Sequence, residues 1–299
     1  MNFCKYRLPD MPEAKEQFGF EELNGVLYAV CGVTTGAIHS QTLYAYNVNS
    51  GIWTRKTDAP IPLQSPVFRA AGGKLYLIGG YNSYIPLKYN TCYEYDPAYD
   101  SWAQKANMPT AREDAMSAVV DDKIYVFGGV TNPAHTMTRA VEWYDPSIDM
   151  WTVEDDIPEN KALGDQGVTY NGKIYLISGT ADMATYSYNL RANTRVMEYD
   201  PVTQSWTYRT EAPWAKCYGE VEEIGGKLYF IGGCHVKPAE YTPVDEVYDI
   251  ASDSWESDSS MAYQARAIGL AKYNGCLYVA GGFNGVFLSK FYRLTVYGT

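Results

Sequence analysis

Residues 118–129 read Ala-Val-Val-Asp-Asp-Lys-Ile-Tyr-Val-Phe-Gly-Gly, and this stretch decides the fold. Two mostly apolar runs flank the Asp121-Asp122 pair, which is typical of two buried strands joined by a tight turn. After a polar loop come Val-Glu-Trp-Tyr-Asp-Pro, a short turn and Met150-Trp151-Thr152. The order predicts a four-stranded antiparallel unit, in which the second strand ends at a glycine pair and a long loop precedes the third strand.

Much the same unit recurs along the chain. Glycine pairs or their remnants, spaced by 48 to 54 residues, end at Gly32, Gly80, Gly129, Gly179, Gly233 and Gly282. A tryptophan marks the last strand of each of the first five units, and a tyrosine stands seven residues before it. These tryptophans are Trp53, Trp102, Trp151, Trp206 and Trp255. An internal period of this length is the signature of a repeat architecture.

The glycine pairs, the spaced tyrosine and tryptophan, and the Leu/Ile-Tyr strand before each pair resemble the kelch repeat over nearly the whole chain. The resemblance implies an all-β fold, a six-bladed kelch-type β-propeller with four-stranded antiparallel blades. We expect one domain over residues 1–299. The fixed spacing of the tryptophans predicts that they are largely buried between neighbouring blades and do not face a ligand.

The two ends of the chain predict how the ring closes. The sixth unit has a third strand around residues 291–294, but its fourth-strand tryptophan would fall at residue 299, the last one. At the other end, residues 3–8 read as a fourth strand without its own unit, followed by Pro12 at the usual proline position. We expect this N-terminal strand to complete the last blade, because the pairing removes two open sheet edges.

Composition and charge restrict the classes of partner. The formal net charge is −11, and an acidic surface repels phosphate backbones, so we expect no nucleic-acid partner. No apolar run approaches the length of a transmembrane segment, and the N-terminus lacks the apolar stretch of a signal peptide. The six cysteines form no CxxC pair and fit no zinc module, which favours free thiols in a reducing compartment. We therefore expect a cytoplasmic monomer without a cofactor or membrane partner, unless a leader has been removed.

Ligands of such a propeller are expected at the loops after the glycine pairs and at the links between blades. Counting three residues past the proline position of each link gives Lys15, Leu63, Arg112, Lys161, Lys216 and Ala265, with Arg266 directly after the last. One interpretation is structural: each cation pairs with a nearby acid or carbonyl, and kelch repeats often carry Arg at this position. The other is a ring of cations at the channel mouth that binds an anionic group, made of Arg112, Lys161, Lys216 and Arg266.

Aromatic and titratable side chains gather in the same loops. We predict that the wall of the binding site includes Tyr81, Tyr186, Tyr188, Tyr218 and His235. The three histidines, His39, His135 and His235, follow different glycine pairs without a metal-ligand spacing, so we predict no metal site. Acids near the first strands are the candidates for neutralising the cations or, where buried, for proton transfer: Glu113, Asp114, Asp165 and Glu220.

Two classes of function fit these features. The first is a binding propeller that recognises an anionic or peptide ligand through its link loops and post-glycine loops. The second is a small-molecule enzyme on the same scaffold, such as a sugar-acid epimerase or mutarotase, since some kelch-like propellers act on small molecules. A deep closed pocket with convergent acids and cations would favour the enzyme, whereas a shallow aromatic rim would favour a protein partner.

Overall fold

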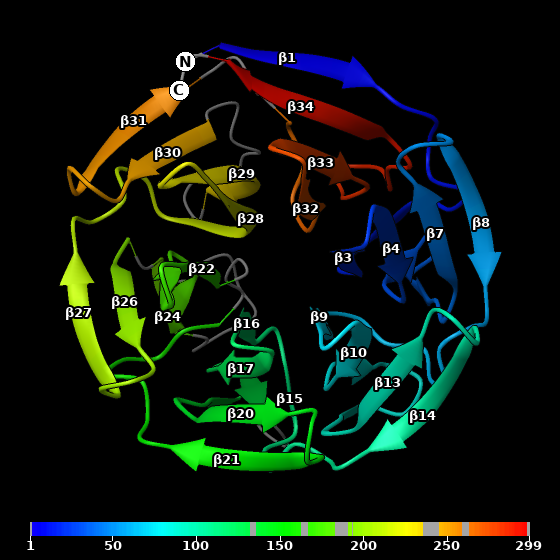
Figure 1. Ribbon diagram of the computed structural model, residues 1–299, viewed down its shortest axis with the longest axis horizontal. Helices are drawn as coiled ribbons and strands as arrows, with labels where there is room; N and C mark the ends of the chain where they lie inside the picture. Colours follow the sequence, from blue (N-terminus) through cyan, green and yellow to red (C-terminus); the bar gives the residue numbers. More distant parts are fainter. Residues whose placement is uncertain are drawn as a thin grey trace.

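The computed structural model describes residues 2–131, 136–162, 167–182, 191–192, 194–235, 245–258 and 263–297. Within these ranges six four-stranded antiparallel sheets surround a common axis as the blades of a propeller (Figure 1). The regular elements of this part of the chain are all strands. The all-β propeller fold inferred from the repeats is therefore confirmed.

Each blade runs from an innermost strand near the axis to an outermost strand at the rim (Figure 1). The first blade contains β3 (Gly19–Leu23), β4 (Val26–Val30), β7 (Leu43–Asn47) and β8 (Ile52–Lys56). The second contains β9 (Val67–Ala71), β10 (Lys74–Ile78), β13 (Cys92–Asp96) and β14 (Ser101–Lys105). The third contains β16 (Met116–Val120), β17 (Lys123–Phe127), β20 (Val141–Asp145) and β21 (Met150–Glu154).

The remaining blades follow the same order. The fourth contains β22 (Val168–Tyr170), β23 (Lys173–Ile177), β26 (Val196–Asp200) and β27 (Ser205–Arg209). The fifth contains β28 (Lys216–Ile224), β29 (Lys227–His235), β30 (Asp245–Asp249) and β31 (Ser254–Asp258), and the sixth contains β32 (Gly269–Tyr273), β33 (Cys276–Ala280), β34 (Phe291–Tyr297) and β1 (Asn2–Arg7). Short strands in the links and loops are β2 (Lys15–Glu16), β5 (Val33–Thr34), β6 (Ile38–His39), β11 (Tyr81–Asn82), β12 (Leu87–Lys88), β15 (Arg112–Glu113), β18 (Val130–Thr131), β19 (Thr136–Met137), β24 (Thr180–Asp182) and β25 (Arg191–Ala192).

The hairpin between the first two strands of each blade is a two-residue turn with both φ angles positive. Asn24 and Gly25 have φ of 54° and 79°, and Asp121 and Asp122 have φ of 50° and 57°. Left-handed pairs of this kind match the right-handed twist of the flanking strands, and Asn, Asp and Gly tolerate them best. The turn residues therefore set the register in which β3 pairs with β4 and β16 with β17.

The hydrophobic core is divided into layers between adjacent blades. One layer joins the second and third blades and includes the fully buried side chains of Ile78, Ile124 and Val126 together with Tyr144. A β-sheet that is apolar on both faces must pack against a neighbour on each side, so a blade cannot bury its faces alone. The packing therefore requires a closed ring.

The ring closes where the N-terminal strand joins the last blade. β1 pairs antiparallel with β34, with Phe3 opposite Val296 and Arg7 opposite Tyr292. The amide of Leu8 continues the contact by donating to the carbonyl of Phe291, at 3.0 Å. Figure 1 shows the blue first strand alongside the red last one, at the rim. The predicted closure is confirmed.

The second glycine of each pair ties its blade to the next one. Its N–H donates to the carbonyl of a link residue at 2.7–3.2 Å, from Gly32 to Leu63, Gly80 to Arg112, Gly129 to Lys161, Gly179 to Lys216, Gly233 to Ala265 and Gly282 to Lys15. The first position of the pair is equally crowded: a Cβ on Gly79 would lie 2.6 Å from the carbonyl oxygen of Arg112. The close backbone of the next blade and the positive φ favour glycine at this position. Cys31 and Ser178 occupy it in the first and fourth blades, with φ of 60° and 53°.

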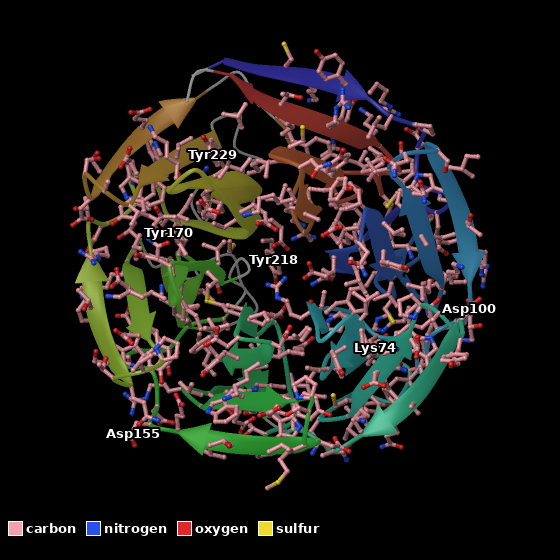
Figure 2. All side chains as sticks on the ribbon, in the orientation of Figure 1. Lys74, Asp100, Asp155, Tyr170, Tyr218 and Tyr229 are labelled. Carbon is pink, nitrogen blue, oxygen red and sulfur yellow. The ribbon has the colours of Figure 1, made fainter. Side chains whose placement is uncertain are left out.

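A second contact between blades lies at the rim, where the repeated tryptophans stand. The indole of Trp151 donates to the carbonyl of Ala106 at 2.8 Å, and Asp149 accepts from the amide of Ala106 and the hydroxyl of Tyr144 at 2.8 and 2.6 Å. Tyr95, Asp100 and Trp102 hold Thr57 in the same way, and Figure 2 shows Asp100 at the outer edge of the ring. The five tryptophans are half-buried and not enclosed, because the outermost strand faces solvent on its free edge.

Removal of residues 1–8 is expected to lower the free energy of unfolding by several kcal/mol, because β34 loses a full hydrogen-bonded partner and the apolar surface beneath it is exposed. Urea unfolding of the truncated and full-length chains measures the difference. Addition of a synthetic peptide of residues 1–8 should partly restore the midpoint. An unchanged midpoint after truncation would contradict the closure.

Asp149→Ala is expected to destabilise the fold by about 2–3 kcal/mol, since the amide of Ala106 and the hydroxyl of Tyr144 lose their acceptor. Asp149→Asn is the matched control, because both bonds end on Oδ1 and the amide oxygen of asparagine can still accept them. Chemical unfolding of both variants checks the order. Equal stability of Asp149→Ala and the wild type would show that this contact between blades adds nothing.

Candidate binding site at the axis of the propeller

The recurring cations of the links are mostly structural. Arg112 has a relative exposure of 1%, and its guanidinium contacts Glu142 at 2.6 Å and the carbonyls of Gly128 and Ala140 at 3.0 and 2.9 Å. These two carbonyls lie where β17 ends and just before β20 begins. Arg112 therefore fixes the ends of two strands in its own blade and is closed to a ligand at the mouth of the channel.

The other buried cations have the same role. Lys161 donates to the carbonyls of Ser178 and Arg195, both at 2.9 Å, which are the equivalent positions in the fourth blade. Lys216 is fully buried 3.0 Å from Glu246. The prediction that Arg112, Lys161 and Lys216 bind an anionic group is therefore corrected, since the side chains turn into the blades and are satisfied there.

The sixth blade shows why its link breaks the pattern. Ala265 stands at the cation position, and the hydroxyl of Tyr263 donates instead to the carbonyls of Gly281 and Lys290, at 2.7 and 3.4 Å. Arg266 is one residue further along the chain and points elsewhere. Its guanidinium lies over the rings of Tyr218 and Phe283, with centroid distances of 5.5 and 5.3 Å, and 3.5 Å from Glu16. Of the predicted cations, Arg266 is thus the half-exposed one, beside the predicted Tyr218.

Tyr218 belongs to a ring of backbone positions around the axis. These residues stand fifteen before the second glycine of each pair, have φ between 46° and 59°, and are Gln17, Ser65, Asp114, Tyr218 and Ala267. Their backbones form a chain of hydrogen bonds in which Asp114 donates to Ser65, Ser65 to Gln17, Gln17 to Ala267, and Ala267 to Tyr218, at 2.6–3.4 Å. The sixth equivalent position is Gly164, which lies outside the described residues.

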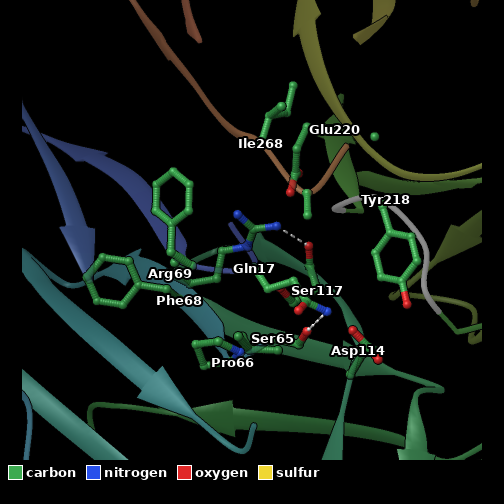
Figure 3. Close-up of a pocket in the computed structure, with 16 residues that line it drawn as sticks. Gln17, Ser65, Pro66, Phe68, Arg69, Asp114, Ser117, Tyr218, Glu220 and Ile268 are labelled. Carbon is green, nitrogen blue, oxygen red and sulfur yellow. Dashed lines mark hydrogen bonds between the residues drawn. The ribbon is translucent and has the colours of Figure 1, made fainter. Parts of the chain in front are cut away.

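The five described positions line a pocket of about 80 Å³, which we call the axial pocket. Its polar wall consists of Gln17, Ser65, Asp114, Tyr218 and Glu220, with Arg69 and Ser117 further in. Figure 3 shows the carboxyl of Asp114 and the hydroxyl end of Tyr218 on the same side of this space. Gln17 donates its side-chain amide to the hydroxyl of Ser65 at 3.2 Å. Side chains from separate blades therefore converge at one point on the axis.

Two neighbouring acids at the pocket, Asp114 and Glu113, have raised pKa values. Burial raises the pKa of the Asp114 carboxyl to about 6, although a hydrogen bond from Ser65 and the charge of Lys88 act in the opposite direction. Burial and the charge of Asp114 raise the pKa of the adjacent Glu113 to about 8, against the effect of Lys88, whose ammonium is 3.3 Å away. Both carboxyls therefore take up a proton at a higher pH than free carboxyls do.

Arg69 separates the axial pocket from a second hollow further along the inner strands. Its guanidinium contacts Glu21 at 3.1 Å and the carbonyl of Ser117 at 2.6 Å, so it joins three blades. The second hollow, about 200 Å³, is also lined by Glu222 and Lys272. Burial and the charge of Glu21 raise the pKa of Glu222 to about 7. Arg69 thus lies between the two hollows, and its charge is already neutralised by Glu21.

The remaining predicted residues do not join the axial pocket. Tyr81 is half-buried beside the buried His39, at a ring distance of 6.2 Å, and His39 contacts the hydroxyl of Ser83 at 3.1 Å. The side chain of His235 and all of Tyr186, Tyr188, His135 and Asp165 lie outside the described residues. Within the described ranges no group of three or more His, Cys, Asp or Glu side chains is placed to hold a metal.

Sequence reasoning named Asp114, Tyr218, Glu220 and Arg266 but missed Gln17, Ser65 and Arg69. The available signal was positional: a count of fifteen residues back from each second glycine gives the ring residues directly. Their residue types vary from blade to blade, so a search for a repeated residue type passes over them.

Comparison with known proteins agrees with the propeller fold. The model of the Attractin/LZTR1 beta-propeller family matches residues 27–292. The chain belongs to this family. The solved "Structure of YjhT" superposes with a TM-score of 0.83 over 98% of both chains, at 18% sequence identity, which shows a shared fold. No helix in the described part is long and apolar enough to cross a membrane.

Similar curated proteins identify this propeller as a kelch-repeat protein. Kelch-like protein 15 of Danio rerio is 28% identical over 148 residues, which cover 43% of this chain and 23% of that protein. An F-box/kelch-repeat protein of Arabidopsis thaliana is 31% identical over 90 residues, or 30% of this chain and 21% of that protein. Alpha-scruin of Limulus polyphemus is 26% identical over 140 residues, or 45% and 15%. The chain thus spans less than a quarter of the length of these relatives.

Arg112→Glu is expected to lower the free energy of unfolding by about 3–5 kcal/mol, because it places a second carboxylate beside the buried Glu142 and removes two carbonyl contacts. Arg266→Glu is the matched control: Arg266 is half-exposed, so the loss should be much smaller. Urea unfolding of both variants measures the contrast. A wild-type midpoint for Arg112→Glu would restore the binding interpretation of this position.

Proposed function

We propose that this propeller is a binding module whose axial pocket receives a basic side chain from a peptide or protein partner. The kelch propeller fold supports an interaction role in general. The observation that carries the specific proposal is the charge of the described pocket wall. Asp114 and Glu220 contribute two carboxylates, whereas Arg69 is its one cation and already contacts Glu21 and the Ser117 carbonyl.

The size of the pocket favours one side chain over a whole metabolite. Pockets for drug-sized ligands usually have a volume of about 300–1,000 Å³, and the axial pocket has about 80 Å³. A lysine or arginine side chain brings several donors to a carboxylate, a hydroxyl and an amide oxygen, which Asp114, Ser65 and Gln17 supply. The ring of Tyr218 already carries the guanidinium of Arg266 on one side, which shows that it suits cation–π contact.

An anionic ligand remains the rival within the binding class. The anionic ligand was predicted from the ring of cations, but three of these, Arg112, Lys161 and Lys216, are buried and paired. Arg266, beside Tyr218, would be the remaining contact.

An enzyme acting on a small molecule, such as a sugar-acid epimerase or mutarotase, is favoured by a different observation. Asp114 has a pKa raised to about 6 beside Tyr218, which suits proton transfer near neutral pH.

The test compares simple probes by thermal shift and calorimetry, at several values of pH. N-acetyl-lysine amide and N-acetyl-arginine amide should stabilise the protein, whereas N-acetyl-glutamate amide should not. Asp114→Asn should weaken binding of the basic probes by about tenfold or more, because a charged hydrogen bond is lost. Binding should also weaken as the pH falls through about 6, since Asp114 then gains its proton and loses its charge.

Asp149→Asn provides the control, because it is the same substitution at the rim of the ring, away from the pocket. It should leave binding of the probes unchanged. Stabilisation by the acidic probe alone, lost in Arg266→Glu, would favour the anionic ligand. Turnover of a sugar acid, followed by proton NMR and lost in Asp114→Asn, would favour the enzyme. Binding of the wild-type chain to a peptide array would then show which residues around the basic side chain are preferred.

A further inference from the structure

Two cysteines face each other near the axial pocket. Cys217 in β28 stands directly opposite Cys234 in β29, and their sulfur atoms are 3.7 Å apart. Cys217 is buried and Cys234 is half-buried. The other thiols differ: Cys31 and Cys92 are buried, and Cys276 contacts the hydroxyl of Thr295. The geometry therefore brings together a solvent-reachable thiol and a covered one.

The backbone at this pair suits a covalent bond. Directly opposed residues of an antiparallel pair have Cα atoms about 4.5–5.5 Å apart, within the range that a disulfide spans. The sulfur atoms need to approach from 3.7 Å to the bond length of about 2.05 Å, a shift that side-chain rotation can supply. The following paired residues are Gly219 and Gly232, so no side chain on them resists the adjustment.

Exposure and electrostatics both favour Cys234 as the reactive sulfur, since Cys217 is the more buried of the two. The hydrogen bond with Cys217 and the positive charge of Arg266 lower the pKa of the Cys234 thiol, in spite of its burial. Burial has the opposite effect on the thiol of Cys31 and raises its pKa to about 12. A thiolate is the nucleophile in thiol oxidation, so Cys234 is the attacking group and Cys217 the resolving one.

We propose that Cys217 and Cys234 are a redox-active dithiol that a peroxide oxidises to a cross-strand disulfide. The thiolate of Cys234 attacks one oxygen of hydrogen peroxide, which gives the sulfenic acid and hydroxide. The thiol of Cys217 then attacks this sulfur, and the S–S bond forms as water leaves. In sum two thiols and one peroxide give one disulfide and two waters, and a dithiol reductant reverses the reaction. This proposal does not depend on the proposed binding function.

The experiment treats the full chain with hydrogen peroxide and maps the disulfides by mass spectrometry without reduction. Trypsin cuts after Lys227, which lies between the two cysteines, so the disulfide appears as two linked peptides. The wild type should lose two hydrogen atoms and give this linked pair, and dithiothreitol should restore both thiols. Oxidation confined to the exposed Cys4, or linkage of any other pair, would overturn the proposal.

Variants separate the two roles. Cys217→Ser should leave Cys234 as a sulfenic acid that dimedone captures, and Cys234→Ser should oxidise about tenfold more slowly. Cys276→Ser is the matched control and should form the linked pair at the wild-type rate. Where a variant does not fold, native alkylation of the wild type replaces it: iodoacetamide should label Cys234 well before Cys31 and Cys92. Labelling of Cys234 no faster than these two would contradict the proposal.

Discussion

The structure depends on one hydrogen bond that occurs at all six junctions: from the second residue of each glycine pair to a carbonyl of the next blade's link. The bond brings the link close to the pair, and at Gly79 a Cβ would lie 2.6 Å from the carbonyl oxygen of Arg112. It therefore explains the most regular feature of the sequence. It also fixes the position of the link residue, which stands shortly before the first strand of the next blade or, at Lys216, begins it.

The cation at this link position, such as Arg112, turns into its own blade and binds backbone carbonyls there. Once the carbonyl of Arg112 is held by Gly80, its side chain reaches the carbonyls of Gly128 and Ala140 at the ends of two strands, where the Ala140 carbonyl also accepts from the amide of Gly128. Buried carbonyls without a donor cost free energy, so a long cationic side chain is a general solution. In the sixth blade Tyr263 delivers a hydroxyl to the same two positions. The recurring cation of the links thus marks a structural role, the binding of carbonyls at the strand ends.

Much of the fold could be predicted from the sequence because its determinants are local and repeated. The turn pairs, the glycine pairs and the period each specify geometry within about ten residues or one blade, and the lone strand at the N-terminus indicated the closure. The tryptophans pack against the core layers as their spacing indicated, although spacing does not tell how much of an outermost strand faces solvent. The orientation of Arg112 was not predictable either, because its acceptors are backbone atoms, which every residue has.

The axial pocket follows a different rule, which explains why it was only partly found. Its positions repeat in backbone conformation: Gln17, Ser65 and Asp114 all adopt positive φ, which costs roughly 1 kcal/mol or more each for a residue with a side chain. The chain of hydrogen bonds between these backbones offsets that cost without using any side chain. The side chains are consequently released from a structural role and can differ in every blade. In this propeller the repeated residue types build the scaffold, and the repeated conformation with unrepeated side chains marks the site.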